Sequence, residues 1–231
     1  MAGGAPPLPE RTMKSLLILG AGGFGHMIQE TALMLGYEKT AFLDDAVKET
    51  DVIGKCCDYE SFLKEYDTAV AALGDNNMRL YWTEKLMEAG YQVPAIIHPS
   101  AVVSPSAVIG NGSFIMQNAV VNTHTTVEHG VLINSGAVVD HDSFIGRGAH
   151  IGLGSVVKSN CKIAPKPKVE AGEVIFSTLR KIAGLADRTL YDALYAFRLG
   201  PTSRSYHPSH SVPTHLPSTL HLPPPSVTVL S

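Results

Sequence analysis

The chain has 231 residues, of which 45% are hydrophobic and 17% are charged, and its formal net charge is −3. These values describe an ordinary globular protein with room for two small domains, and the lack of a basic field argues against nucleic acid as a partner. No apolar run reaches the roughly 18 residues that a membrane span needs. The cysteines Cys56, Cys57 and Cys161 suit neither a disulfide framework nor a metal site, so we expect a cytoplasmic protein without bound metal.

Residues 1–12 carry Glu10 and prolines where a signal peptide would have an apolar core, and we expect a disordered leader there. Residues 13–95 then alternate strand-like and helix-like segments. The expected strands are 14–19, 40–43 and 68–73, and the expected helices are 25–35, 61–65 and 79–89. This order predicts a small Rossmann-like α/β domain with a parallel sheet.

A strict six-residue period follows, in which isoleucine or valine occupies fourteen successive positions. These positions are Ile97, Val103, Ile109, Ile115, Val121, Val127, Ile133, Val139, Ile145, Ile151, Val157, Ile163, Val169 and Ile175. An amphipathic helix needs a period near 3.6, so the pattern predicts a repeat architecture instead.

A triangular prism explains the period, because each side takes one hexapeptide and three sides make a coil of about 18 residues. Small residues such as Ala137 and Ser143 lie two positions before the aliphatic residue, where a corner leaves little room. Turn formers precede the small residues at Gly112, Asn118, Gly130, Gly136, Asp142, Gly148, Gly154, Asn160 and Gly172. We therefore expect residues 96–176 to form a left-handed parallel β-helix, with the repeat fading near 165–176, where Pro167 and Glu173 interrupt the small-residue pattern.

Two further segments complete the predicted organisation. Residues 177–200 are expected to form a helical extension, most clearly over 187–197, where Asp187 is the candidate N-cap. Residues 201–231 contain seven prolines, seven serines and no acidic residue, a composition that builds no core and predicts a disordered tail.

A glycine-rich loop, Gly20-Ala-Gly-Gly-Phe-Gly25, joins the first expected strand to the first expected helix. Glycines there let backbone amides approach a phosphate at a helix N-terminus. Asp44 and Asp45 close the next strand, where a carboxylate can bind ribose hydroxyls, and the segment 74–79 follows the third strand. These features together predict a nucleotide or nucleotide-sugar pocket. The alternative is tight strand–helix packing with no ligand.

The repeat also carries Asp140-His141-Asp142. A prism core is aliphatic, so His141 is not needed for stacking, and its near-neutral pKa suits a general base. The neighbouring carboxylate of Asp142 can orient the imidazole and stabilise its protonated form. The alternative is a solvated corner histidine, which is the interpretation that we adopt for His124 and His129.

Residues 14–176 resemble the hexapeptide-repeat sugar acyltransferases, which include sialic-acid O-acetyltransferases and UDP-4-amino-sugar N-acetyltransferases of bacillosamine synthesis. The matching segments are GAGGFG (20–25), FLDD (42–45), LGDNNMR (73–79), IHPSAVVSPSAVIGNG (97–112) and INSGAVVDHDSFIGRGAHIG (133–152). Two departures stand out: the family loop often reads GAGGHGK, whereas this chain has Phe24 and His26, and typical members have more coils after the segment of His150.

The resemblance implies a role for each matching residue. His141 would be the general base that activates the acceptor against acetyl-CoA, and Asp142 would orient it. His150 and Gly152 would lie at the acetyl-CoA pocket. The acceptor and its nucleotide would be held by Gly20, Gly22, Gly23, Gly25, Asp44, Asp45, Gly74, Asn76, Arg79 and Asn134. Family members resemble one another in being homotrimers with an active site between two prisms.

The favoured function is therefore an acyl-CoA-dependent acyltransferase acting on an amino or hydroxyl group of a sugar or nucleotide-sugar, without a metal. The alternative is a non-catalytic module that binds nucleotide-sugars or assists assembly, which the shortened repeat favours and which would bind no acetyl-CoA. A nicotinamide-dependent oxidoreductase is a third hypothesis. It is disfavoured because the α/β unit spans only residues 13–95. In addition, we expect no separate catalytic domain in the chain other than the repeat.

Overall fold

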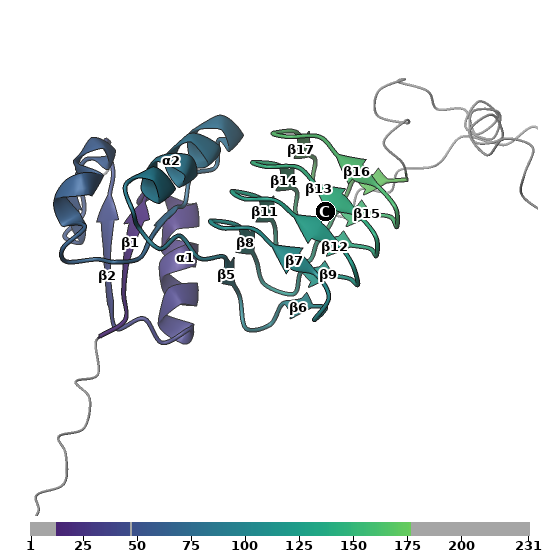
Figure 1. Ribbon diagram of the computed structural model, residues 1–231, viewed down its shortest axis with the longest axis horizontal. Coiled ribbons are helices and arrows are strands. Elements are labelled where there is room, and N and C mark those ends of the chain that lie inside the picture. Colours follow the sequence, from purple (N-terminus) through teal and green to yellow (C-terminus); the bar gives the residue numbers. More distant parts are fainter. Residues whose placement is uncertain (1–12, 47, 177–231) are drawn as a thin grey trace, which may run out of the picture. The chain divides into compact units, whose positions relative to one another are not determined.

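The computed structural model describes residues 13–46 and 48–176, which all fall within one compact unit (Figure 1). The predicted leader at 1–12, the helical extension at 177–200 and the tail at 201–231 lie outside the described residues. Within those residues, no helix has both the length and the apolar character that crossing a membrane requires.

The first part is a four-stranded parallel sheet with the strand order β3-β2-β1-β4. The strands are β1 (Ser15–Leu19), β2 (Lys39–Leu43), β3 (Val52–Gly54) and β4 (Ala69–Ala71), and the helices are α1 (Gly23–Met34), the 3₁₀ helix η1 (Cys56–Phe62) and α2 (Asn76–Glu88). Strand β1 lies between β2 and β4 and is buried along its whole length, as its apolar run predicts. Leu16 and Ile18 face a core that includes α1, whereas Leu17 and Leu19 face a core that includes η1 and α2.

Three local predictions differ from the structure. Strand β3 was not predicted, because three residues are too few for a visible alternation. The short helix expected at 61–65 is instead η1, whose start is fixed where the carboxylates of Asp58 and Asp45 accept the backbone N–H groups of Lys55 and Cys56. Helix α2 begins at Asn76, inside the expected turn, because the Asp75 carboxylate caps its first turn.

The second part is the predicted left-handed parallel β-helix, built from three sheets that we call the first, second and third faces. The first face contains β5 (Ile96–Ile97), β8 (Phe114–Ile115), β11 (Leu132–Ile133), β14 (His150–Ile151) and β17 (Lys168–Val169). The second contains β6 (Val102–Val103), β9 (Val120–Val121), β12 (Val138–Val139), β15 (Val156–Val157) and β18 (Val174–Ile175). The third contains β7 (Val108–Ile109), β10 (Thr126–Val127), β13 (Phe144–Ile145) and β16 (Lys162–Ile163).

The fourteen predicted aliphatic positions all pack into one core inside the prism. From Ile115 onward each of them is at most 5% exposed, whereas Ile97, Val103 and Ile109 in the first coil are partly buried. Strands β17 and β18 stay in register with β14 and β15. The expected fading of the repeat near 165 is therefore wrong, because the aliphatic stacking persists although the small-residue pattern does not.

The corners of the prism turn through left-handed backbone at every sixth residue from 112 to 172. All nine predicted turn formers have positive φ. Two further corner residues, His124 (φ 57°) and Lys166 (φ 66°), share this conformation. Their side chains gave no turn signal, yet the period alone assigns them to corners.

Helix α2 lies against one column of corner glycines. A Cβ atom at Gly112 would lie 2.5 Å from Thr83 Cγ2, and one at Gly148 would lie 3.1 Å from Leu80 Cβ. On the other side of the sheet, the Phe24 ring meets the Phe114 ring edge-on, with 5.2 Å between the ring centroids. The α/β part is thus packed closely onto the first face of the prism and the adjoining corner.

The inward stacking predicts different effects for the same substitution at an inward and at an outward position. Val127 is 1% exposed and points inward, whereas Val108 is 61% exposed and points outward. Val127→Ala should lower the free energy of unfolding by about 2 kcal/mol, because it removes two buried methyl groups and leaves a cavity. Val108→Ala should change it by less than about 0.5 kcal/mol. Urea unfolding measures both, and equal effects would contradict the assignment of the core.

Candidate active site

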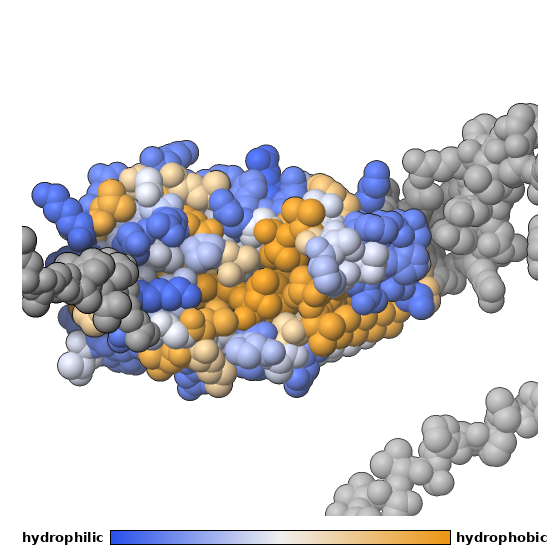
Figure 2. Space-filling model, turned by 60° about the horizontal axis from the view of Figure 1, so that its bottom comes forward, coloured by the Kyte–Doolittle hydropathy of each residue, from blue (hydrophilic) through white to orange (hydrophobic). Residues whose placement is uncertain are grey.

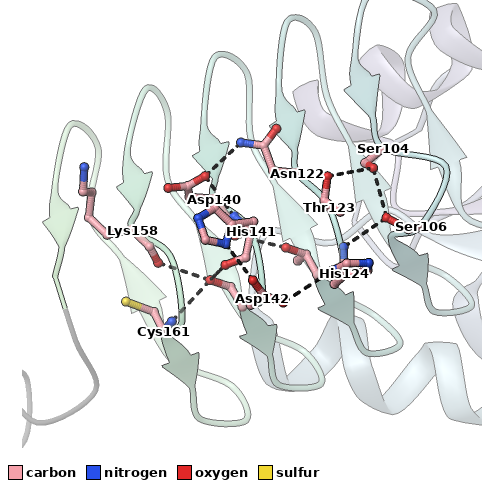
Figure 3. Close-up of polar contacts among 12 residues, drawn as sticks. Ser104, Ser106, Asn122, Thr123, His124, Asp140, His141, Asp142, Lys158 and Cys161 are labelled. Carbon is pink, nitrogen blue, oxygen red and sulfur yellow. Dashed lines mark hydrogen bonds and ion pairs between the residues drawn. The ribbon is translucent and has the colours of Figure 1, made fainter. Parts of the chain in front are cut away.

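His141 lies at the corner between β12 and β13, where the second and third faces meet (Figure 3). Its Nδ1 atom is 2.7 Å from the Asp142 carboxylate Oδ2. Asp142 has a φ of 55°, a conformation that aspartate tolerates better than most residues. The corner therefore joins the two side chains that the sequence analysis paired.

The electrostatics of this pair follow from its hydrogen bond. The bond to Asp142 raises the pKa of His141 and lowers the pKa of Asp142, so the protonated imidazole is stabilised beside the carboxylate. With Nδ1 engaged by Asp142, Nε2 is the nitrogen that can take up a proton from another molecule. The side chain of His141 is half exposed, so a partner can reach it.

A second carboxylate, Asp140, fixes the backbone of the same corner. Its Oδ1 accepts the His141 backbone N–H at 2.9 Å and the Asn122 side-chain amide at 3.0 Å. These bonds lower the pKa of Asp140 and keep it ionised. Asn122 was missed in the sequence analysis, although it lies 18 residues before Asp140 and the coil length places it directly below.

The two histidines that were expected to be solvated also have partners. His124 Nδ1 lies 3.5 Å from the second oxygen of the Asp142 carboxylate. His129 Nε2 lies 3.3 Å from Glu84 Oε1 on α2. The expectation of a solvated corner is confirmed for His124, whose side chain is 67% exposed. It is wrong for His129, which is only 29% exposed because α2 lies beside it.

A different group of predicted residues lies on the first face. The Asn134 side-chain amide donates to His150 Nε2 at 3.2 Å. Burial and the positive charges of Arg79 and Lys168 lower the pKa of His150 to about 4, so this imidazole is neutral at pH 7. Gly152 lies in a tight part of the coil, where a Cβ atom would lie 2.5 Å from Val169 O.

These two groups lie on opposite sides of one prism. His150 is the outward residue of β14 on the first face, and the His141 corner joins the other two faces. In a triangular prism, the corner between two faces is opposite the third face. The structure therefore does not bring His141 and His150 together within one chain.

The glycine-rich loop separates into two kinds of position. A Cβ at Gly25 would lie 2.0 Å from Gly20 O, and one at Gly20 would lie 2.8 Å from Ala72 O, so packing of the chain explains both residues. Gly22 and Gly23 are exposed at the start of α1, and nothing lies within 4 Å of a Cβ added to either. The open backbone of these two glycines is where a ligand can approach.

The acidic residues near this loop contact the protein itself. Asp44 Oδ2 accepts the Ala21 backbone N–H at 2.8 Å, and Asp45 Oδ1 accepts the Cys56 N–H at 3.1 Å. Gly74 follows β4, which is the neighbour of β1, and it is exposed with open space around its Cα. Gly22, Gly23 and Gly74 thus lie at the same edge of the sheet, where parallel sheets commonly bind ligands.

Arg79 and Asn76 connect α2 to the prism. The Arg79 side chain is fully buried, and its guanidinium donates to the Asn76 carboxamide oxygen and to backbone carbonyls. The carbonyls belong to Leu73, Gly74, Gly130, Gly148 and Ala149. Asn76 Nδ2 donates to the carbonyls of Lys166 and Pro167. This placement argues against the expected substrate contact of Arg79, because its donors already bind the protein.

Burial lowers the pKa of Arg79 to about 10, so the guanidinium stays charged at neutral pH. Among residues 13–46 and 48–176, no group of three or more histidine, cysteine, aspartate or glutamate side chains could hold a metal ion. The three cysteines are free thiols.

Comparisons with known proteins agree with this architecture. The PglD N-terminal domain family matches residues 15–86. UDP-N-acetylbacillosamine N-acetyltransferase of Bacillus subtilis (strain 168) is 32% identical over 113 residues, which cover 45% of this chain and 52% of the relative. The chain thus spans about half the length of the curated relative that it matches.

Two solved structures extend the likeness. PerB from Caulobacter crescentus, in complex with CoA and GDP-perosamine, has a TM-score of 0.64 and 27% identity, covering 71% of this chain and 89% of that chain. The acetyltransferase domain of PglB from Neisseria gonorrhoeae, in complex with acetyl coenzyme A, has a TM-score of 0.58 and 30% identity, covering 70% of this chain and 92% of that chain.

The buried position of Arg79 predicts a structural phenotype. Arg79→Met should lower the free energy of unfolding by about 3 kcal/mol or more, because it leaves several buried carbonyls without a donor. Lys85→Met on the same helix removes an exposed cation and should change it by less than about 0.5 kcal/mol. Thermal and urea unfolding measure both variants. If Arg79→Met were as stable as the wild type, the structural role would be refuted.

Proposed function

Because the chain belongs to the family of hexapeptide-repeat sugar acyltransferases, we propose that it transfers an acyl group from acyl-CoA to an amino or hydroxyl group of a nucleotide-linked sugar. The observation that carries the proposal is the His141–Asp142 pair, with 2.7 Å between Nδ1 and Oδ2 on a polar corner of the prism. The aliphatic core accounts for the stability of the prism, so neither residue is needed there.

His141 acts as the general base of this reaction. Its Nε2 takes a proton from the acceptor amine or hydroxyl while that atom attacks the thioester carbonyl. The new C–N or C–O bond forms, the C–S bond breaks, and the imidazolium returns the proton to the departing CoA thiolate. Asp142 holds the proton on Nδ1 and stabilises the imidazolium, as the raised pKa of His141 indicates.

The nucleotide-sugar is proposed to bind at the exposed glycines of the α/β part. The backbone of Gly22 and Gly23 lies at the N-terminus of α1, which favours a phosphate group. Gly74 at the end of the adjacent strand leaves room on the other side. Asp44 and Asp45 support the site indirectly, because they hold the loop and η1 by backbone hydrogen bonds.

A complete site is proposed to need more than one copy of the chain. The first face, with Asn134 and the neutral His150, lies opposite the corner of His141, so a neighbouring prism must bring the two together. We propose a homotrimer, in which His150 and Gly152 help to bind acyl-CoA and Asn134 contacts the acceptor. The second face supports packing between copies, because its outward residues are the valines 102, 120, 138, 156 and 174. Figure 2 shows a continuous band of apolar surface on the face in view.

The proposed base predicts the pH dependence of turnover. His141→Asn should abolish acyl transfer and leave the fold intact, and assays of CoA thiol release measure it. In the wild type, kcat/KM should fall as the pH falls through the raised pKa of His141, because the protonated imidazole accepts no proton. Asp142→Asn, which tolerates the positive φ, should move this fall to lower pH and reduce the plateau. Full activity of His141→Asn would remove His141 from the mechanism.

The proposed phosphate contact predicts a binding defect without a folding defect. Gly23→Ala adds a methyl group into open space, so the unfolding free energy should not decrease. The methyl group should block close approach of a phosphate and weaken binding of a UDP-sugar by about tenfold, or about 1.4 kcal/mol. Isothermal titration calorimetry measures the affinity, with Glu30→Ala on the exposed side of α1 as the control. Unchanged affinity in Gly23→Ala would place the nucleotide elsewhere.

A further inference from the structure

The Asp142 carboxylate lies between two imidazoles from successive coils (Figure 3). Its Oδ2 is 2.7 Å from His141 Nδ1, and its Oδ1 is 3.5 Å from His124 Nδ1. Each carboxylate oxygen therefore faces a different histidine. The proposed reaction uses His141 and Asp142 and gives no role to His124.

The backbone fixes His124 at this place. Residues 124 and 142 are one coil apart in the same corner column and have nearly identical φ values of 57° and 55°. The Asp142 N–H donates to Thr123 O at 3.0 Å, and the His124 N–H donates to Ser106 Oγ at 3.2 Å. The approach of His124 to Asp142 is thus set by the register of the coils.

The orientation of the carboxylate matters because a general base at Nε2 needs its proton on Nδ1. Nothing in an isolated neutral imidazole holds the proton there, so the hydrogen bond to Asp142 must select this tautomer. A carboxylate held by one contact can rotate about its Cβ–Cγ bond and lose the alignment of Oδ2. A second contact on Oδ1 opposes that rotation.

We propose that His124 is a positioning residue for acyl transfer, which acts by holding Oδ1 of Asp142 so that Oδ2 keeps His141 aligned. This proposal rests on the proposed function of His141 as the general base. The charged groups beside the three residues are Asp140, which binds the His141 backbone, and Lys158 in the next coil. In this role His124 acts through Asp142 and not by contact with the acceptor or acyl-CoA.

The corner offers a matched pair of substitutions at residue 124. His124→Asn keeps a nitrogen donor in place, because Nδ2 of asparagine and Nδ1 of histidine are both one bond beyond Cγ. His124→Gly removes the side chain. Asparagine accepts the backbone conformation, as Asn118 and Asn160 show with φ values of 56° and 58°. Glycine accepts it too, as the corner residue Gly136 shows with a φ of 69°. Asn118→Gly is the control for making a corner more flexible, since it lies at a different corner.

Steady-state kinetics should separate the three variants. His124→Gly should lower kcat about two- to fivefold, as expected when one exposed hydrogen-bonding contact is lost, with unchanged KM for acyl-CoA and for the acceptor. His124→Asn should restore kcat to nearly the wild-type value, and Asn118→Gly should leave it unchanged. Wild-type kcat in His124→Gly, a change in KM alone, or no rescue by asparagine would overturn the proposal.

A spectroscopic readout tests the same contact without substrate. Imidazole ¹⁵N shifts in histidine-labelled protein, recorded above the pKa of His141, report which ring nitrogen carries the proton. The Nδ1–H tautomer of His141 should be less populated in His124→Gly and should recover in His124→Asn, with His141→Asn identifying the signals. Unchanged tautomer populations would refute the positioning role. Activity retained in His141→Asn would instead refute the proposed base, whatever the tautomer measurement shows.

Discussion

Stacking of branched aliphatic side chains at a fixed interval of 18 residues is the constraint on which the prism depends. Parallel pairing between coils, such as Val138 with Val156 and Val139 with Val157, places each residue over its equivalent in the coil below. The same register arranges the polar corner residues in columns, although they contribute nothing to the core. His124 meets Asp142 and Asn122 meets Asp140 because the aliphatic residues beside them are stacked. The residues that form the core and the residues proposed for catalysis therefore occupy different positions of the same repeat.

The α/β part is attached to this prism by contacts that have no counterpart in the repeat. The Arg79 guanidinium binds carbonyls of two corner turns, and the corner glycines leave room for Leu80 and Thr83 of α2. This attachment places the exposed glycines of the glycine-rich loop on the part that packs against the first face. The His141–Asp142 pair lies at the opposite corner. This separation within one chain supports the proposal that the site is assembled between copies.

Much of the fold follows from the sequence, because the repeat is periodic and local. One or two hexapeptides contain all the residues needed to predict three features. These are the inward positions, nine of the eleven left-handed corners and the His141–Asp142 pair. The structural roles of Arg79 and Asp44 could not be predicted in the same way. Their partners include backbone atoms 51 and 23 residues away, respectively, and backbone atoms leave no trace in side-chain patterns. In the sequence, Phe24 stood out only because it departs from the family's loop pattern. Its contact with Phe114 explains why an apolar residue occupies position 24. The contact of His124 with Asp142 could have been predicted, because His124 lies one coil, or 18 residues, before Asp142.

The most direct test of the account is CoA thiol release from acetyl-CoA, measured across UDP-amino-sugars and sialic acids, with the product mass determined. The account predicts release of one thiol for each acetyl group added to one class of sugar, and no release without the sugar. Binding of a nucleotide-sugar without binding of acetyl-CoA, and without thiol release on any acceptor, would contradict it and would indicate a non-catalytic binding module.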